Sequence, residues 1–334
     1  MTPNVPWPAK PPTLRATIDA CGLGHESAPE GDVLSSLGAL AAAWQIDLPP
    51  RPAVSAARLI APRRHSAYAL FDRWLMRSMP PDATARLGAL AQATVGARLE
   101  LIVLRGRSQF DIVQEIAAPL WPEMLAAWAG LADQQRRRLH HLRRTLEVVR
   151  DPGQLTPRRL ADLISALDEL RRIFADVYRY PRYTRAVPNL FAALETRWEP
   201  ELGTIEDEIV FAAMQLLVIG SEPSASLIGP LVDMAMQRPK LLAQLRANPS
   251  RVAAFVEEKQ ANFTQRRNAP RETADSGLAF EFVGRQLAKA QAVAVLRALL
   301  CMPIEIEAKK RSASWHTRSD GTRQLDHLEL RFIA

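Results

Sequence analysis

Residues 188–258 read PNLFAALETRWEPELGTIEDEIVFAAMQLLVIGSEPSASLIGPLVDMAMQRPKLLAQLRANPSRVAAFVEE. Apolar residues recur in this segment at spacings of three and four, which is the period of an α-helix. They predict a long apolar helix from about Ile205 to Met236, followed by shorter helices at Pro239–Ala247 and Pro249–Gln260. We expect an interruption of the long helix at Gly220–Ser224, because an internal proline removes one backbone hydrogen bond and clashes with the preceding turn.

The same periodicity extends over most of the chain on the N-terminal side of this segment. It predicts helices at Val33–Trp44, Ser66–Met79, Ala83–Arg105, Phe110–Gly130, Asp133–Arg150 and Pro157–Tyr180. Strand signals are confined to Pro303–Glu307 and Leu325–Phe332, where apolar residues alternate around a Ser-Asp-Gly turn. The sequence therefore predicts a mainly α protein with a small β-sheet near the C-terminus.

Composition favours a globular chain with one large core. The 334 residues are 48% hydrophobic and show no internal repeat, so we expect a single domain, 1–334. We expect no apolar stretch to reach the roughly 18 to 20 residues that span a bilayer, and the start, MTPNVPWPAKPP, lacks the apolar core of a secretory signal. We expect a cytoplasmic protein that binds neither membrane nor nucleic acid, with its net charge of +7 spread over solvated helices.

Metal and nucleophile motifs are missing from the sequence. Cys21 and Cys301 lie near opposite ends of the chain, which predicts neither a disulfide framework nor a thiolate cluster. The six histidines include no H-x-x-x-H or H-E-x-x-H spacing, so no metal site is predicted. Phosphate-binding loops, dinucleotide turns and G-x-S-x-G elbows are absent as well.

In the order and spacing of its helices, the segment 188–258 resembles the I, J and K helices of bacterial cytochromes P450. Residues 108–131, SQFDIVQEIAAPLWPEMLAAWAGL, resemble that family's D to E helix passage, and residues 284–300, GRQLAKAQAVAVLRALL, resemble its L helix. The resemblance implies a truncated P450-like helical fold. Its parts would be an irregular Pro-rich segment plus a helix at 1–50, a helical body at 51–260, a shortened remnant of the heme-loop region at 261–283, and an L-like helix with C-terminal strands at 284–334.

The resemblance also implies where a heme would be held. In P450s a loop before the L helix carries the cysteine that ligates iron, but here Phe282 and Val283 precede Gly284 and no cysteine is present. The family's Glu-x-x-Arg pair of the K helix corresponds to Glu258 and Ala261, without the arginine. From these departures we expect that the chain binds no heme and needs no cofactor.

Two further positions also depart from the P450 pattern. The acid and alcohol that deliver protons in the I helix correspond to Glu222 and Pro223, with Ser224 next, so Glu222 and Ser224 are the candidate catalytic residues. In the C helix, His65 matches a propionate-binding histidine, whereas Ala69 stands where an arginine is expected.

Heme-free relatives of the family are known chiefly as auxiliary proteins of antibiotic glycosyltransferases. The first hypothesis is therefore a noncatalytic partner in natural-product metabolism that stabilises or activates a glycosyltransferase or another biosynthetic enzyme. The alternative is a repurposed enzyme that binds a small molecule in the former P450 pocket and uses Glu222 for acid/base chemistry, such as cyclisation or isomerisation. A third possibility is a heme held by a different axial ligand.

Overall fold

The computed structural model describes residues 30–60, 74, 77–78, 82–150, 155–180, 189–196, 205–267, 278–309, 312–317 and 323–333. Contacts between residues divide the chain into two compact units, Met1–His65 with Arg144–Glu169, and Ser66–Arg143 with Leu170–Ala334. The expected single domain stays a prediction.

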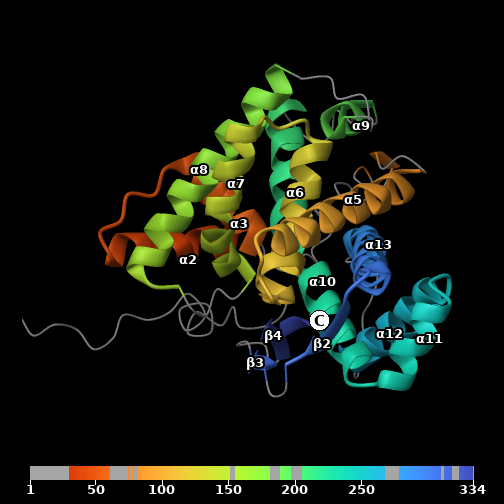
Figure 1. Ribbon diagram of the computed structural model, residues 1–334. Helices are drawn as coiled ribbons and strands as arrows, with labels where there is room; N and C mark the ends of the chain where they lie inside the picture. Colours follow the sequence, from red (N-terminus) through yellow and green to blue (C-terminus); the bar gives the residue numbers. More distant parts are fainter. Residues whose placement is uncertain are drawn as a thin grey trace, which may run out of the picture. The chain divides into compact units, whose positions relative to one another are not determined.

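The first unit is built on two helices near the N-terminus, α2 (Glu30–Ala43) and α3 (Pro50–Ile60). They pack against each other (Figure 1), and α3 also contacts the short 3-10 helix η2 (Glu147–Arg150). Apolar side chains at helical spacing are buried in both helices; they include Val33, Leu37, Leu40, Ala53, Ala56 and Ala57. Residues 157–169 of α8 (Pro157–Arg179) complete this unit.

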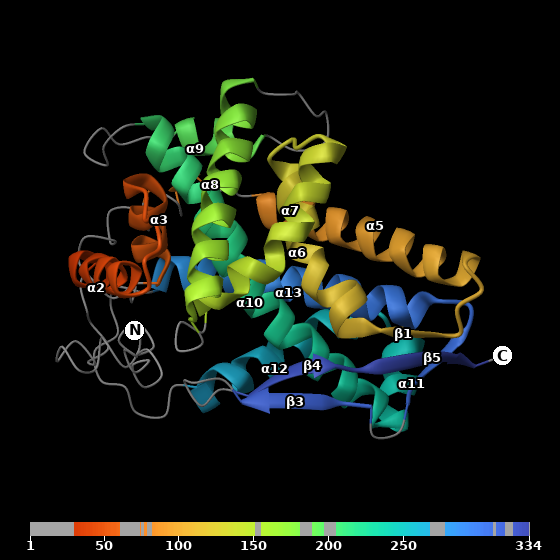
Figure 2. The ribbon, with the colours of Figure 1, turned by 90° about the vertical axis from the view of Figure 1, so that its left-hand side faces the viewer.

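The second unit is organised around two long helices, α10 (Ile205–Met236) and α13 (Leu278–Cys301), which pack along each other. α5 (Ala83–Leu104) packs on α13, and α6 (Ala118–Trp128) packs on α10 (Figure 2). Further described helices of this unit are α7 (Asp133–Leu146, of which 133–143 belong to this unit), α9 (Leu190–Thr196), α11 (Pro239–Ala247) and α12 (Arg251–Arg267).

The core of the second unit is fixed by buried tryptophans as well as by aliphatic side chains. Trp121 on α6 is fully buried, and its Nε1 donates a hydrogen bond to the carbonyl of Leu216 on α10, 2.7 Å away. Trp74 is equally buried and donates from Nε1 to the carbonyl of Leu194 at 3.1 Å. Each indole therefore joins segments that are distant in sequence while its polar atom stays satisfied.

The helix α5 contradicts the expectation that no apolar stretch is long enough to span a membrane. Thr84–Leu104 of α5 is long and apolar enough to cross a bilayer by length and composition, so the prediction that no stretch reaches that length was wrong. The residues of α5 that are buried recur at about every fourth position, which places them on one face; they are Leu87, Ala91, Val95, Leu99 and Ile102. This face packs along α13, whereas the apolar side chains of Leu101 and Leu104 on α5 are exposed.

The helix α10 is continuous where an interruption was expected. The backbone is helical throughout Ile205–Met236, including 220–224. Apolar side chains are buried on both sides of this stretch, at 209–214 and 216–218 and again at 227–228 and 231–232. Packing of the two flanking segments therefore outweighs the backbone hydrogen bonds that are lost at the two internal prolines, Pro223 and Pro230.

The predicted helix at Phe110–Gly130 begins differently in the structure. Residues Gln109–Asp111 form a strand, β1, and Ile112–Ala117 form a π-helix, η1, before α6 starts. The carboxylate of Asp111 accepts hydrogen bonds from the backbone N–H groups of Val113 and Gln114, at 2.8 and 3.1 Å. This cap begins the helical stretch at Ile112, and β1 is left to pair with the sheet.

The predicted C-terminal sheet is present, with more strands than expected. β5 (Glu329–Ile333) lies between β1 and β2 (Glu305–Ala308), and both pairings are antiparallel. A separate hairpin pairs β3 (Ser314–Thr317) with β4 (Arg323–His327). The single strand predicted at Leu325–Phe332 is thus divided at Leu328, which is buried.

Candidate functional site

Several residues singled out by the sequence lie where the structure gives no side-chain description. Glu222, Pro223 and Ser224 are part of α10, but the side chains of 219–225 are outside the described residues. His65 and Ala69 also lie outside the described residues. The assignment of Glu222 and Ser224 as catalytic residues therefore stays a prediction.

The region expected as a shortened heme-loop remnant, 261–283, is helical at both of its ends. α12 continues beyond Ala261 to Arg267, and α13 already begins at Leu278, so Phe282, Val283 and Gly284 fall within its first two turns. The side chains of 261–267 and 278–285 are not described. Glu258 is exposed on α12 and forms an ion pair with its neighbour Lys259 at 2.6 Å.

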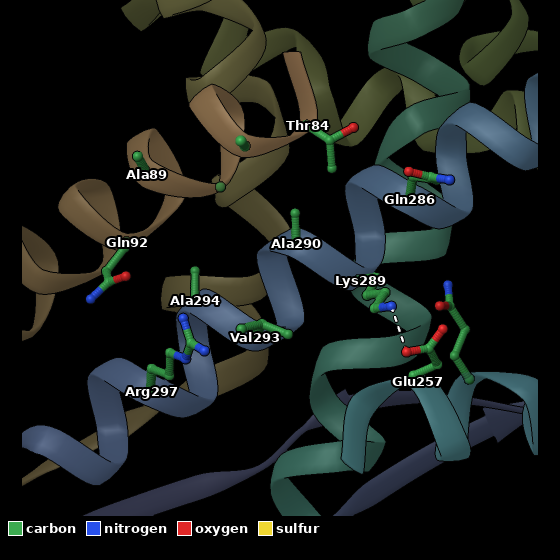
Figure 3. Close-up of a pocket in the computed structure, with 13 residues that line it drawn as sticks. Thr84, Ala89, Gln92, Glu257, Gln286, Lys289, Ala290, Val293, Ala294 and Arg297 are labelled. Atoms are coloured by element: carbon green, nitrogen blue, oxygen red, sulfur yellow. Dashed lines mark ion pairs between the residues drawn. The ribbon is translucent and has the colours of Figure 1, made fainter. Parts of the chain in front are cut away.

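A groove that sequence reasoning missed lies between α5, α12 and α13 (Figure 3). Its volume is about 660 Å³. Small side chains from α5 and α13 form the floor, and polar side chains from all three helices form the rim. The lining residues on α13, which include Gln286, Ala290, Val293 and Arg297, follow one another at intervals of three and four and so share one helix face. Only this spacing could have identified the groove from the sequence.

The charges of the groove are unevenly paired. Nζ of Lys289 lies 2.9 Å from Oε2 of Glu257 on α12, so this cation is balanced locally. Arg297 is half-buried, and its guanidinium has no hydrogen-bond or ion-pair partner among the described residues. The groove therefore carries one uncompensated positive charge at the end that Arg297 occupies.

A second polar cluster fixes the junction of α5, η1 and α6. Arg98 pairs with Glu123 and donates from Nη1 to the carbonyl of Glu115 at 2.6 Å. Burial lowers the pKa of the Arg98 guanidinium. The hydrogen bonds from Arg107, at 2.5 and 2.9 Å, lower the pKa of the Glu115 carboxyl. These ion pairs hold the π-helix η1 against α5 and α6, so we interpret the cluster as structural.

Comparison with known proteins identifies relatives among bacterial cytochromes P450, although no known family model matches the chain. Cytochrome P450 107B1 of Saccharopolyspora erythraea is 26% identical over 55% of this chain and 46% of its own length. The putative cytochrome P450 123 of Mycobacterium tuberculosis is 30% identical over 48% of this chain and 39% of its own length. The chain thus spans less than half the length of the curated relatives it matches.

Solved structures with the same arrangement of helices cover more of the chain. CalO2 superimposes with a TM-score of 0.69 and 18% identity, over 96% of this chain and 88% of its own. LnmA, a P450 hydroxylase of the leinamycin biosynthetic pathway of Streptomyces atroolivaceus, gives 0.63 and 17% identity over 86% and 83%. P450BioI, solved in complex with an acyl carrier protein, gives 0.62 and 16% over 84% of each chain.

The expectation that the chain needs no cofactor was wrong. The relatives that it matches are cytochromes P450, and one similar structure is the P450 heme domain of Tepidiphilus thermophilus, with a TM-score of 0.65 and 13% identity over 85% of this chain and 81% of its own. These comparisons point to heme as the cofactor class of the fold. The prediction of no heme rested on altered family positions and a shortened segment in the sequence alone.

The residues that are present do not fit a heme held by a thiolate at the start of α13. Phe282 and its neighbours belong to a helix, where the resemblance requires a cysteine-bearing loop. The described cysteine, Cys301, is exposed in the last turn of α13, at the end opposite to that position. No reaction step through heme follows from these residues.

The fold itself is established by agreement of the two kinds of comparison. Sequence relatives and solved structures both lead to cytochromes P450, and the mainly helical chain with a small antiparallel sheet near its C-terminus matches them. The protein has a cytochrome P450-like fold, and its structural neighbours include a protein of natural-product biosynthesis.

Proposed function

We propose that this chain is a P450-like partner protein in natural-product biosynthesis, which binds another biosynthetic enzyme and raises its rate or its solubility. Two observations support the proposal. The fold is similar to that of LnmA, a P450 hydroxylase of a biosynthetic pathway, and the start of α13 carries no cysteine. A glycosyltransferase is the class of partner that the sequence resemblance implies. A protein that binds only the native state of its partner stabilises that state by mass action.

The observation that carries the proposal is the cationic exposed face of α7. Between 133 and 143 one acidic residue, Asp133, accompanies a set of basic and histidine side chains: Arg136, Arg137, Arg138, His140, His141 and Arg143. Leu139 is buried, whereas Arg136, Arg137 and Arg138 are exposed to solvent. Arg136 also donates from Nε to the carbonyl of Leu131 at 2.9 Å.

Such a face suits an acidic protein surface. Like charges that are crowded on a short stretch of helix repel each other, and an acidic partner relieves this repulsion while it steers association. P450BioI offers a precedent within the fold, because it was solved in complex with an acyl carrier protein. Arginine is also a residue that contributes strongly at protein interfaces.

The experiment combines purification with a rate measurement. The full chain is expressed alone and together with each enzyme encoded beside it, and the activity and soluble yield of each enzyme are measured in both cases. We expect one enzyme to copurify with the chain and to gain activity. A chain that stays monomeric and changes no neighbour's rate or solubility contradicts the proposal.

Charge reversal on α7 tests the docking surface. Arg137→Glu is expected to weaken the copurified complex and to reduce the activation, because it places a carboxylate among cations on an exposed face. Arg251→Glu is the matched control, since Arg251 is equally exposed but lies at the beginning of α12. Equal loss of complex in both variants contradicts docking on α7.

The cofactor is measured on the same preparations. Cells are supplied with a heme precursor, and the purified chain is examined for a Soret band before it is mixed with the partner enzyme. Activation is then compared between preparations with high and low heme content. A gain in the partner's rate that depends on turnover of a heme in this chain contradicts a noncatalytic role.

A further inference from the structure

We propose that the groove between α5, α12 and α13 binds a small molecule made of a carboxylate and an apolar body. The carboxylate binds the Arg297 guanidinium, and the apolar body lies on the floor of small side chains. The site lies entirely within the second unit and requires no partner protein.

The floor is shaped for an elongated apolar group. Gly88 and Ala89 of α5 line the groove together with Ala290 and Ala294 of α13, and none of these four residues carries a side chain larger than a methyl group. A Cβ at Gly88 would lie 3.7 Å from the Cβ of Ala290, so the backbones of α5 and α13 approach closely at the base of the groove. Larger side chains on this face would close the groove.

Arg297 supplies the reason for an anion. Arg297 is half-buried where it lines the groove, and no described residue offers its guanidinium a carboxylate or carbonyl. A planar carboxylate matches the two parallel N–H groups of a guanidinium and forms strong charge-assisted hydrogen bonds with it. Among the lining residues, Lys289 already has Glu257 as its partner, so the free charge is that of Arg297.

The separation of the two cations sets the length of the ligand. Lys289 and Arg297 are eight residues apart on α13, which corresponds to about 12 Å along a helix axis. Figure 3 shows Ala290, Val293 and Ala294 between them. A ligand whose carboxylate binds Arg297 thus extends over these side chains toward the Lys289–Glu257 ion pair, as a medium-chain acid would.

The test uses decanoate as the probe, and neutral decanol and decyltrimethylammonium as comparison ligands. Binding to the full chain is measured by titration calorimetry. We expect saturable binding of decanoate and at least about tenfold weaker binding of the other two, because they make no charge-assisted hydrogen bond to Arg297. Equal binding of the three ligands overturns the proposal.

Variants locate the site. Arg297→Gln is expected to weaken decanoate binding by about tenfold or more, and Ala89→Trp to abolish it, because the exposed Ala89 position tolerates an indole that fills the groove. Arg251→Gln, outside the groove, is expected to bind as the unchanged protein does. Retention of full affinity in Ala89→Trp places any bound acid in another cavity and overturns the proposal, provided that circular dichroism shows the variant folded. The outcome is independent of any partner enzyme.

Discussion

Nδ1 of His327 lies 2.6 Å from Oδ2 of Asp111, although 216 residues separate the two in the chain. The other oxygen of the same carboxylate accepts hydrogen bonds from Val113 and Gln114 at the start of η1, and from the N–H of Leu328 at 3.3 Å. One carboxylate therefore begins a helix and holds the connection between β4 and β5. The Asp111 side chain thereby links the start of η1 to the residues between β4 and β5, which lie near the C-terminus.

Replacing Asp111 by alanine should destabilise the protein. The variant loses a helix cap, a hydrogen bond to His327 and a hydrogen bond to Leu328, and we expect the free energy of unfolding to fall by about 2 to 3 kcal/mol. Urea denaturation followed by circular dichroism measures the change. The loss should appear as a shift of the midpoint without a large change in slope.

Asp82 provides the matched control for this variant. It occupies the same position before α5, but its side chain makes no capping hydrogen bond, and its ion pair with Arg86 is exposed. Asp82→Ala is expected to change the free energy of unfolding by less than about 1 kcal/mol. If the two variants lose equal stability, the carboxylate of Asp111 does not join η1 to the sheet region in an energetically significant way.

The pKa of Glu115 predicts a pH dependence of stability. Hydrogen bonds from Arg107 lower the pKa of this carboxyl below its ordinary value in the folded protein. A depressed pKa contributes stability that is fully present above the ordinary glutamate pKa of about 4.3 and is lost as the pH falls through the folded pKa. Glu115→Gln should therefore cost about 1 kcal/mol at neutral pH and progressively less in acid.

Unfolding curves recorded at several pH values check this dependence. Glu100→Gln is the control, because Glu100 is exposed on α5 and has no ion pair among the described residues. We expect its difference from the unchanged protein to stay below about 0.5 kcal/mol at every pH. A Glu115→Gln difference that grows as the pH falls contradicts a stabilising role of the ionised Glu115 carboxylate.

Helical periodicity predicted most of the fold. The bounds Pro239–Ala247 were predicted without error, and α5 and α8 end within one residue of the prediction, because apolar spacing and prolines at helix starts are local signals. The strand β1 was missed because its pairing with β5 joins Phe110 to Leu330. A pairing between residues so far apart in sequence cannot be detected in the local spacing of apolar residues. Pairing with β5 makes 109–111 a strand although the local spacing favours a helix.

The site was less predictable for a similar reason. Arg297 looks like any other arginine of a helix in the sequence, and its lack of a partner among the described residues follows only from the packing of α5, α12 and α13. The prediction about the cofactor was wrong for another reason. Four altered family positions predicted that the chain binds no heme, whereas the comparisons point to heme. Individual ligand positions describe how a group is held, and they do not define the cofactor class of a fold.

Gly229 on α10 marks a close approach of three elements. A Cβ at this position would lie 3.0 Å from Cδ2 of Leu325 and 3.2 Å from Cγ2 of Val113, and both of these side chains are buried. Gly229→Ala should therefore strain the packing of β4 and η1 against α10, and we expect a loss of about 1 to 2 kcal/mol in the free energy of unfolding.

Gly96 on α5 is the control for the glycine prediction. A Cβ there meets no atom within 4 Å, and alanine favours a helix more than glycine does. Gly96→Ala is thus expected to stabilise the protein by about 0.5 to 1 kcal/mol. The two alanine variants should shift the thermal midpoint in opposite directions, and a stabilising Gly229→Ala contradicts the close approach.

The buried amide of Gln215 gives a final prediction. Gln215 on α10 is 1% exposed, and neither Oε1 nor Nε2 has a hydrogen-bond partner among the described residues. A buried polar group without partners costs about 1 to 3 kcal/mol, so Gln215→Leu, which keeps the approximate volume, should raise the free energy of unfolding by about 1 kcal/mol. Trp121→Phe is the opposite control, because it removes a satisfied donor from the same core and should destabilise. If Gln215→Leu destabilises instead, the amide has a bonding role in the native protein that its described neighbours do not supply.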